Sequence, residues 1–190
     1  MGFWVFVFSV AALFLIYPYI RVFFKRLVLH TKLLRLCKNK KYNLIHNSIF
    51  WFFGGKKGTA CDFYIETPDE IYSVKLFGMK KKWSVLYLLE GGEYMIRKFI
   101  AAISFGGQGV RFPIDSKSQK LPGYNFRINF KSEWDIKTPH NILLINPVCH
   151  DIMRRSKNGK EARVGAGETF NGMEIYPLTR FLGELEAKNE

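Results

Sequence analysis

The chain has 190 residues, of which 48% are hydrophobic and 16% aromatic, so its composition excludes an intrinsically disordered protein. The formal charge of +13 is unevenly distributed: residues 1–61 contain ten Lys or Arg and no acid, whereas the remainder carries 19 bases and 16 acids. This distribution argues against a uniformly basic nucleic-acid-binding domain. The three cysteines have no CxxC spacing, which is typical of reduced thiols rather than of a disulfide framework.

The first predicted element is an uncharged hydrophobic run from Phe3 to Ile20, whose 18 residues fall within the ~17–25 that a transmembrane helix needs. We therefore predict a transmembrane anchor over residues 1–20, kinked or ended near Pro18. A cleaved signal peptide is disfavoured because no basic segment precedes the run and no A-x-A site follows it. A buried helix of a soluble domain is disfavoured because Phe, Val and Leu lie on every face.

Residues 21–37 predict a basic amphipathic helix, with apolar residues at helical spacing on one face. Its basic side chains are Arg21, Lys25, Arg26, Lys32 and Arg35. By the positive-inside rule these charges predict a single-pass membrane protein with its amino terminus outside and its carboxyl-terminal domain in the cytoplasm. Two interpretations of the helix stay open: it lies on a membrane surface against anionic lipid head groups, or it is the first helix of the domain with solvated charges.

Residues 38–190 predict a single globular α+β domain that is mixed and β-rich. The patterns that predict its elements are period-two alternation, continuous apolar runs and helical spacing, together with turn residues such as Pro68-Asp69. In chain order the predictions are a strand or interfacial patch at 48–53, a turn at 54–58, a hairpin of strands 60–66 and 71–77, a strand at 83–89 after the basic loop 80–82, a short helix at 94–103, a strand at 124–130, an interior strand at 141–148 and a closing helix from Pro177.

Most patterns that could carry chemistry are incomplete. The glycine-rich segments 105–109 and 164–167 lack the Gly-Lys-Ser/Thr of a phosphate-binding loop and are predicted to be turns. His140, Cys149 and His150 do not have the spacing of a structural zinc site. A single Cys is usually a buried apolar residue, so a Cys149 nucleophile is disfavoured.

One hairpin has a suggestive arrangement, with Asp62 in its first strand and Ser73-Val74-Lys75 in its second. This resembles the catalytic hairpin of the PD-(D/E)XK nuclease superfamily, including the NERD-type domains. The resemblance implies Asp62 as a Mg²⁺ ligand and catalytic residue, and Lys75 as the catalytic residue that holds the substrate phosphate. The predicted order of helix, hairpin, third strand, helix 94–103 and apolar strand is similar to that core as well.

The hairpin also departs from the family. The acid expected two residues before the lysine is Ser73, and Glu66 and Glu70 are the nearby substitutes, neither at the motif's spacing. The strand at 124–130 is an insertion relative to that core.

These features favour a membrane-anchored, non-enzymatic adaptor, sensor or binding module without a cofactor. Its expected partners are the membrane, anionic lipid head groups and another protein. The alternative is a membrane-tethered nuclease-like domain that would use Mg²⁺ and is inactive because Ser73 replaces the acid. Nucleic acid as a partner has no support beyond this alternative.

Overall fold

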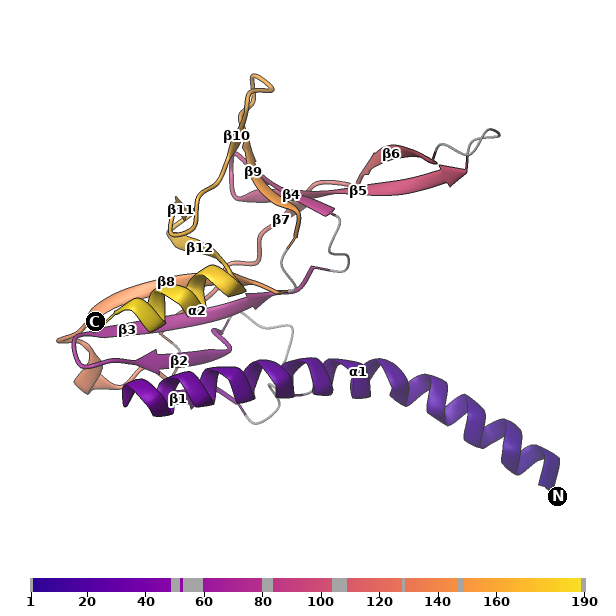
Figure 1. The fold of residues 1–190 in the computed structure, drawn as a ribbon, viewed down its shortest axis with the longest axis horizontal. Helices are drawn as coiled ribbons and strands as arrows, with labels where there is room; N and C mark the ends of the chain where they lie inside the picture. The colour runs from indigo at the N-terminus through magenta and orange to yellow at the C-terminus, as the bar shows by residue number, and fades with distance from the viewer. Residues whose placement is uncertain are drawn as a thin grey trace.

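The computed structural model describes residues 2–48, 52, 60–79, 84–103, 109–127, 129–146 and 149–188, without the side chains of residues 2–6, 8–15, 100–103 and 109–111. The fold is mixed α+β and β-rich, as predicted, with two helices and two mixed sheets in this part of the chain (Figure 1). The helices are α1 (Gly2–Lys40) and α2 (Leu178–Ala187), and a 3₁₀ turn lies at Ser132–Trp134. The strands are β1 (Asn43–His46), β2 (Phe63–Glu66), β3 (Glu70–Phe77), β4 (Ser84–Leu89), β5 (Glu93–Ile103), β6 (Gly109–Asp115), β7 (Gln119–Lys120), β8 (Thr138–Ile145), β9 (Asp151–Arg155), β10 (Glu161–Arg163), β11 (Thr169–Phe170) and β12 (Met173–Pro177).

The first sheet has the strand order β1-β2-β3-β8-β12-β11. The predicted hairpin is confirmed as β2 and β3, and its turn closes where the Thr67 N–H donates to the Glu70 carbonyl at 3.0 Å. The interior strand is confirmed as β8, in which the residues from Ile142 to Ile145 are fully buried. Because β3, β8 and β12 run parallel, their carboxyl ends meet at one edge of the sheet.

The second sheet has the order β10-β9-β4-β5-β6, with β7 added beside β5. The predicted strand at 83–89 corresponds to β4. Leu86 and Leu88 of β4 pack with Leu143 and Ile145 of β8 in one buried cluster, so the two sheets share a core. The hairpin of β5 and β6 extends away from this core (Figure 1).

The opposite face of the first sheet is covered by α1 and α2. Leu29, Leu33 and Leu36 of α1 are buried together with Phe181 and Leu185 of α2, against Phe63, Ile65 and Val74 of the sheet. The closing helix is confirmed, with Pro177 at the position before its first turn. The carboxyl-terminal half of α1 is thus an integral layer of the domain.

The amino-terminal prediction requires two corrections. The helix does not end near Pro18 but continues without a break from Gly2 to Lys40, so the predicted elements 1–20 and 21–37 form a single helix. The predicted single-pass membrane localisation is contradicted: within the described residues, no helix is long and apolar enough to cross a membrane. The side chains of residues 2–6 and 8–15 of the predicted anchor lie outside the described residues.

The helix predicted at 94–103 is wrong, because this segment is β5. Its residues pair on both sides, with β4 and with β6. Tyr94 and Ile96 face the core shared by the sheets, while Met95 and Phe99 belong to the cluster on the other face. Helical spacing of apolar residues was coincidental here, and strand pairing determined the structure.

The strand predicted at 124–130 is also wrong. The described residues form turns, in which Asn125 Oδ1 accepts a hydrogen bond from the Arg127 N–H at 2.9 Å and Asn129 adopts φ 60°. Among the described residues the segment pairs only through an isolated bridge of Asn125 with Ala60. Tyr124 and Phe126 still pack against buried clusters, so the alternation reflects burial rather than a strand. Most of the predicted strand 48–53, the turn 54–58, the basic loop 80–82 and the glycines of 105–108 lie outside the described residues.

Candidate functional site

The basic residues of α1 gather around two adjoining hollows. A large hollow of about 870 Å³ is bordered by Arg21, Lys25, Arg26 and Lys32. A small hollow of about 530 Å³ lies between α1 and α2 and is bordered by Lys32 and Arg35. The two hollows share Val28 and Lys32, and we call them together the α1 furrow. All five basic residues singled out from the sequence therefore line one feature.

The large hollow lies at the edge where the parallel strands end. Leu76 is near the end of β3, Gly78 and Asn146 directly follow β3 and β8, and Leu178 begins α2. Residues 17–32 of α1 form the remaining wall. Crevices at the carboxyl ends of parallel strands are common ligand sites in α/β sheets, because loops and helix starts converge there.

The floor of the large hollow is apolar. Leu29 and Met79 are 2% and 3% exposed, and Val22, Leu76 and Leu178 are half-buried beside them. These side chains come from both helices and from the end of β3, so the floor exists only in the folded chain. It provides a surface where an apolar group can leave water.

The rim of the large hollow is cationic. Arg21, Lys25 and Lys32 are exposed, and no ion pair within the described residues neutralises them. Arg26 is half-buried: burial lowers the pKa of its guanidinium, and the negative charge of Asp62 offsets part of this effect. None of the described residues that line the large hollow carries a carboxylate, so its field favours an anion.

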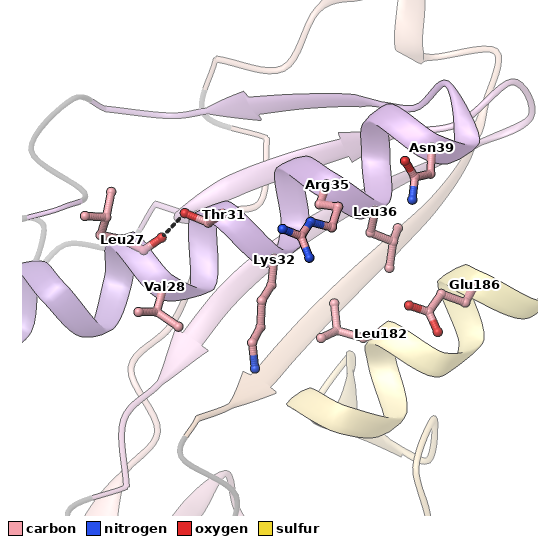
Figure 2. A pocket seen from close by; sticks show the side chains of 9 residues that line it. All are labelled: Leu27, Val28, Thr31, Lys32, Arg35, Leu36, Asn39, Leu182 and Glu186. Carbon is pink, nitrogen blue, oxygen red and sulfur yellow. Dashed lines mark hydrogen bonds between the residues drawn. The ribbon is translucent and has the colours of Figure 1, made fainter.

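The small hollow continues this positive field along the helix. Figure 2 shows the Lys32 side chain extending from α1 into the space beside α2, on which Leu182 and Glu186 lie. Glu186 is the single acid among the described residues that line the α1 furrow. Arg21, Lys25, Lys32 and Arg35 follow one another at i, i+4, i+11 and i+14 on α1, a stripe about 21 Å long at 1.5 Å per residue.

The nuclease-like hairpin brings Asp62 and Lys75 together across neighbouring strands. The Lys75 Nζ lies 3.5 Å from Asp62 Oδ1 and donates to the Ala60 carbonyl at 2.8 Å. Asp62 Oδ2 accepts a hydrogen bond from the Leu76 N–H at 2.8 Å. The side chains of Asp62 and Lys75 are only 7% and 12% exposed. Both carboxylate oxygens are therefore engaged by the chain itself.

The donor set of this hairpin does not fit a Mg²⁺ ion, which prefers several oxygen ligands including carboxylates. Ser73 is 1% exposed and brings a hydroxyl where the resemblance requires an acid. Glu66 pairs with Lys137 at 2.9 Å, and Glu70 lies about 16 Å along the strand from Lys75. Within the described residues, no group of three or more His, Cys, Asp or Glu side chains could hold a metal ion.

Glu70 belongs to a separate polar cluster near the amino ends of β3, β8 and β12. Its Oε2 is 2.5 Å from the Lys188 Nζ, and its Oε1 is 3.6 Å from the His140 Nε2. The His140 ring stacks on Tyr72 at 5.0 Å and its Nδ1 lies 2.8 Å from Glu174 Oε1. These contacts connect β3, β8, β12 and the end of α2. The cluster therefore has a structural role.

The other chemical candidates do not assemble. His140 lies about 16 Å along β8 from the end of that strand, and Cys149 comes after the strand end, so the two residues are far apart. His150 is exposed. Cys149 is buried, and burial raises the pKa of its thiol to about 11, so it carries little thiolate at neutral pH. In the turn at 164–167, the Gly165 N–H donates to Glu168 Oε1, so an acid occupies the place of a phosphate.

The sequence did not indicate Leu76, Gly78, Asn146 or Leu178 as site residues. Their convergence depends on the parallel pairing of β3 with β8 and of β8 with β12. The available signal was that Leu76 and Gly78 lie at the end of the predicted strand 71–77, Asn146 lies in the second half of the predicted strand 141–148, and Leu178 begins the predicted closing helix. This becomes informative only when the strand order is known.

Comparison with protein-family models, with curated proteins and with solved structures gives no match for this chain.

Proposed function

We propose that the chain is a non-enzymatic binding module that holds an anionic ligand in the α1 furrow. The observation that supports this proposal is that the described residues around two adjoining hollows include five cations and one carboxylate. The cations come from an unbroken helix that is packed on the sheet, so they are held at fixed positions along one stripe. A preorganised site of this kind binds without the cost of ordering a flexible segment.

The expected affinity is electrostatic in part and therefore depends on salt. The rim cations are exposed, and at ~0.15 M ionic strength their field decays over about 8 Å. The attraction should weaken as salt is added, while an apolar contribution from the floor should remain.

The test is isothermal titration calorimetry with four anionic probes: inorganic pyrophosphate, dodecyl phosphate below its critical micelle concentration, an octaglutamate peptide and a fifteen-residue oligothymidylate. At least one probe should bind, and binding should fall about tenfold or more in the variant Arg21→Gln/Lys25→Gln/Lys32→Gln, because three favourable charge contacts are lost. Lys38→Gln is the matched control, since Lys38 is exposed on the same helix but lies outside the α1 furrow. If none of the probes binds, or if Lys38→Gln weakens binding as much as the triple variant, the proposal is wrong.

We keep a nuclease-like domain without cleavage activity as the second candidate. Its support is the 3.5 Å approach of Lys75 to Asp62 on adjacent strands, together with the parallel pairing of β3 and β8. Incubation of the wild-type chain with DNA and RNA in Mg²⁺ should give no cleavage, because Ser73 supplies no carboxylate. Cleavage that is lost in Asp62→Asn would instead establish an active nuclease.

A further inference from the structure

The composition of the large hollow restricts what kind of anion it can hold. Apart from its cations, the described residues that line it include two with hydrogen-bonding side chains, Tyr17 and Asn146. A sugar, a nucleoside or a peptide placed on the floor would lose hydrogen bonds to water that these few groups cannot replace. A hydrocarbon chain has no such bonds to lose, and it gains from contact with the buried floor residues.

The position of the charges restricts the ligand further. The exposed cations all come from α1, whereas the floor combines Val22 and Leu29 of α1 with residues at and beyond the end of β3 and the first residue of α2. Charge and apolar surface are thus adjacent within one hollow. A ligand that satisfies both has a charged end and an apolar body.

Exposed apolar side chains extend this pattern. Phe24 and Val28 line the hollow and are 58% and 57% exposed, and they alternate along α1 with the cations. An apolar body lying in the hollow would cover them and remove their surface from water.

We infer that the ligand of the α1 furrow is an anionic amphiphile, with one phosphate or carboxylate head in the positive field of Arg21, Lys25 and Lys32 and a single hydrocarbon chain over the apolar floor. This inference rests on the proposed anion-binding function and names the ligand class. The volume of about 870 Å³ lies within the ~300–1,000 Å³ typical of small-molecule sites, so the large hollow has room for one amphiphile molecule with a single hydrocarbon chain.

The experiment compares dodecyl phosphate with butyl phosphate, which carries the same head, by calorimetry on the full chain below the critical micelle concentration. Dodecyl phosphate should bind at least about tenfold more tightly, because the added methylenes are buried. Phe24→Ser should weaken dodecyl phosphate about five- to tenfold and leave butyl phosphate unchanged. Lys25→Gln/Lys32→Gln should weaken both probes, because both share the head.

Two controls address folding and non-specific adsorption. Leu34 is 49% exposed on α1 and lies outside the α1 furrow, so Leu34→Ser should leave both affinities unchanged. Phe24 is exposed, and its variant should keep the circular dichroism spectrum and melting temperature of the wild type.

The outcomes separate this inference from the proposed function. Equal affinity for dodecyl and butyl phosphate, or stronger binding of octaglutamate or oligothymidylate that the triple variant abolishes, overturns the amphiphile while the anion-binding function stands. Loss of dodecyl phosphate binding in Leu34→Ser would show that the hydrocarbon chain of the ligand does not lie over the floor of the large hollow. Absence of binding by every probe overturns both.

Discussion

Removing the positive charge of Lys75 should strongly destabilise the fold. In the variant Lys75→Met the Asp62 carboxylate, which is 7% exposed in the wild type, loses the ammonium group that lies 3.5 Å from it. Its remaining hydrogen bond is the one that it accepts from the Leu76 N–H. A buried charge without its partner is far costlier than a missing surface ion pair.

The magnitude follows from the geometry. Two unit charges 3.5 Å apart attract by about 5 kcal/mol at an effective dielectric constant of ~20. Breaking a buried pair by removing one partner usually costs ~3–5 kcal/mol. Because the Arg26 guanidinium also attracts Asp62, we expect a loss near the lower end, about 3 kcal/mol.

The assay is urea denaturation followed by circular dichroism, for Lys75→Met, Asp62→Asn and the double variant. The double variant should be more stable than the sum of the single losses predicts, since neither charge is then left alone. Lys131→Met is the matched control: Lys131 pairs with Glu133 at 3.1 Å but both are exposed, so its loss should stay within about 0.5 kcal/mol. A loss below about 1 kcal/mol for Lys75→Met, or strictly additive single losses, would refute a structural ion pair.

Three further predictions concern stability and reactivity. The three cysteine thiols are buried with pKa values raised to about 11, so 5,5′-dithiobis(2-nitrobenzoate) at pH 8 should label them only after unfolding, and rapid labelling of the native chain would contradict their burial. Burial, with a contribution from His30, lowers the pKa of His46 to about 4, so the unfolded chain binds a proton more readily than the folded chain and the free energy of unfolding should fall as the pH drops below about 6.5. The loss between pH 7 and pH 5 is about 2 kcal/mol at most. It should disappear in the variant His46→Gln but not in His150→Gln, because His150 is exposed. Leu33 on α1 is fully buried, so Leu33→Ala should lower the free energy of unfolding by about 2–5 kcal/mol. Leu34 is adjacent but exposed, so Leu34→Ala should lower it by less than about 0.5 kcal/mol. Equal losses would show that α1 is not packed on the sheet.

Local patterns in the sequence determined several elements. The turn at Thr67–Glu70 places Asp62 opposite Lys75 because the hairpin register follows from the turn. The continuous apolar run of β8 and the spaced leucines of α2 identified their elements because each pattern matches the period of one type of secondary structure. The basic stripe of α1 is likewise fixed by helical spacing alone.

Other features depended on tertiary pairing. The segment 94–103 fits a helix by spacing, yet it is β5 because β4 and β6 satisfy its backbone hydrogen bonds. The aromatic alternation at 124–130 fits a strand, yet Asn125 and Asn129 close turns and the side chains still reach the core. In both cases periodicity reports which residues are buried, and a helix, a strand or a turn can bury the same residues.

The α1 furrow shows the same division. The sequence by itself determined that α1 carries a row of cations with no nearby acid along the chain. Only the tertiary structure decided that this row borders a hollow, because Leu76, Met79 and Leu178 come from distant parts of the chain and meet beside α1 through parallel strand pairing. Charge is a property of residues that sequence records directly, whereas concavity is a property of how separate elements pack.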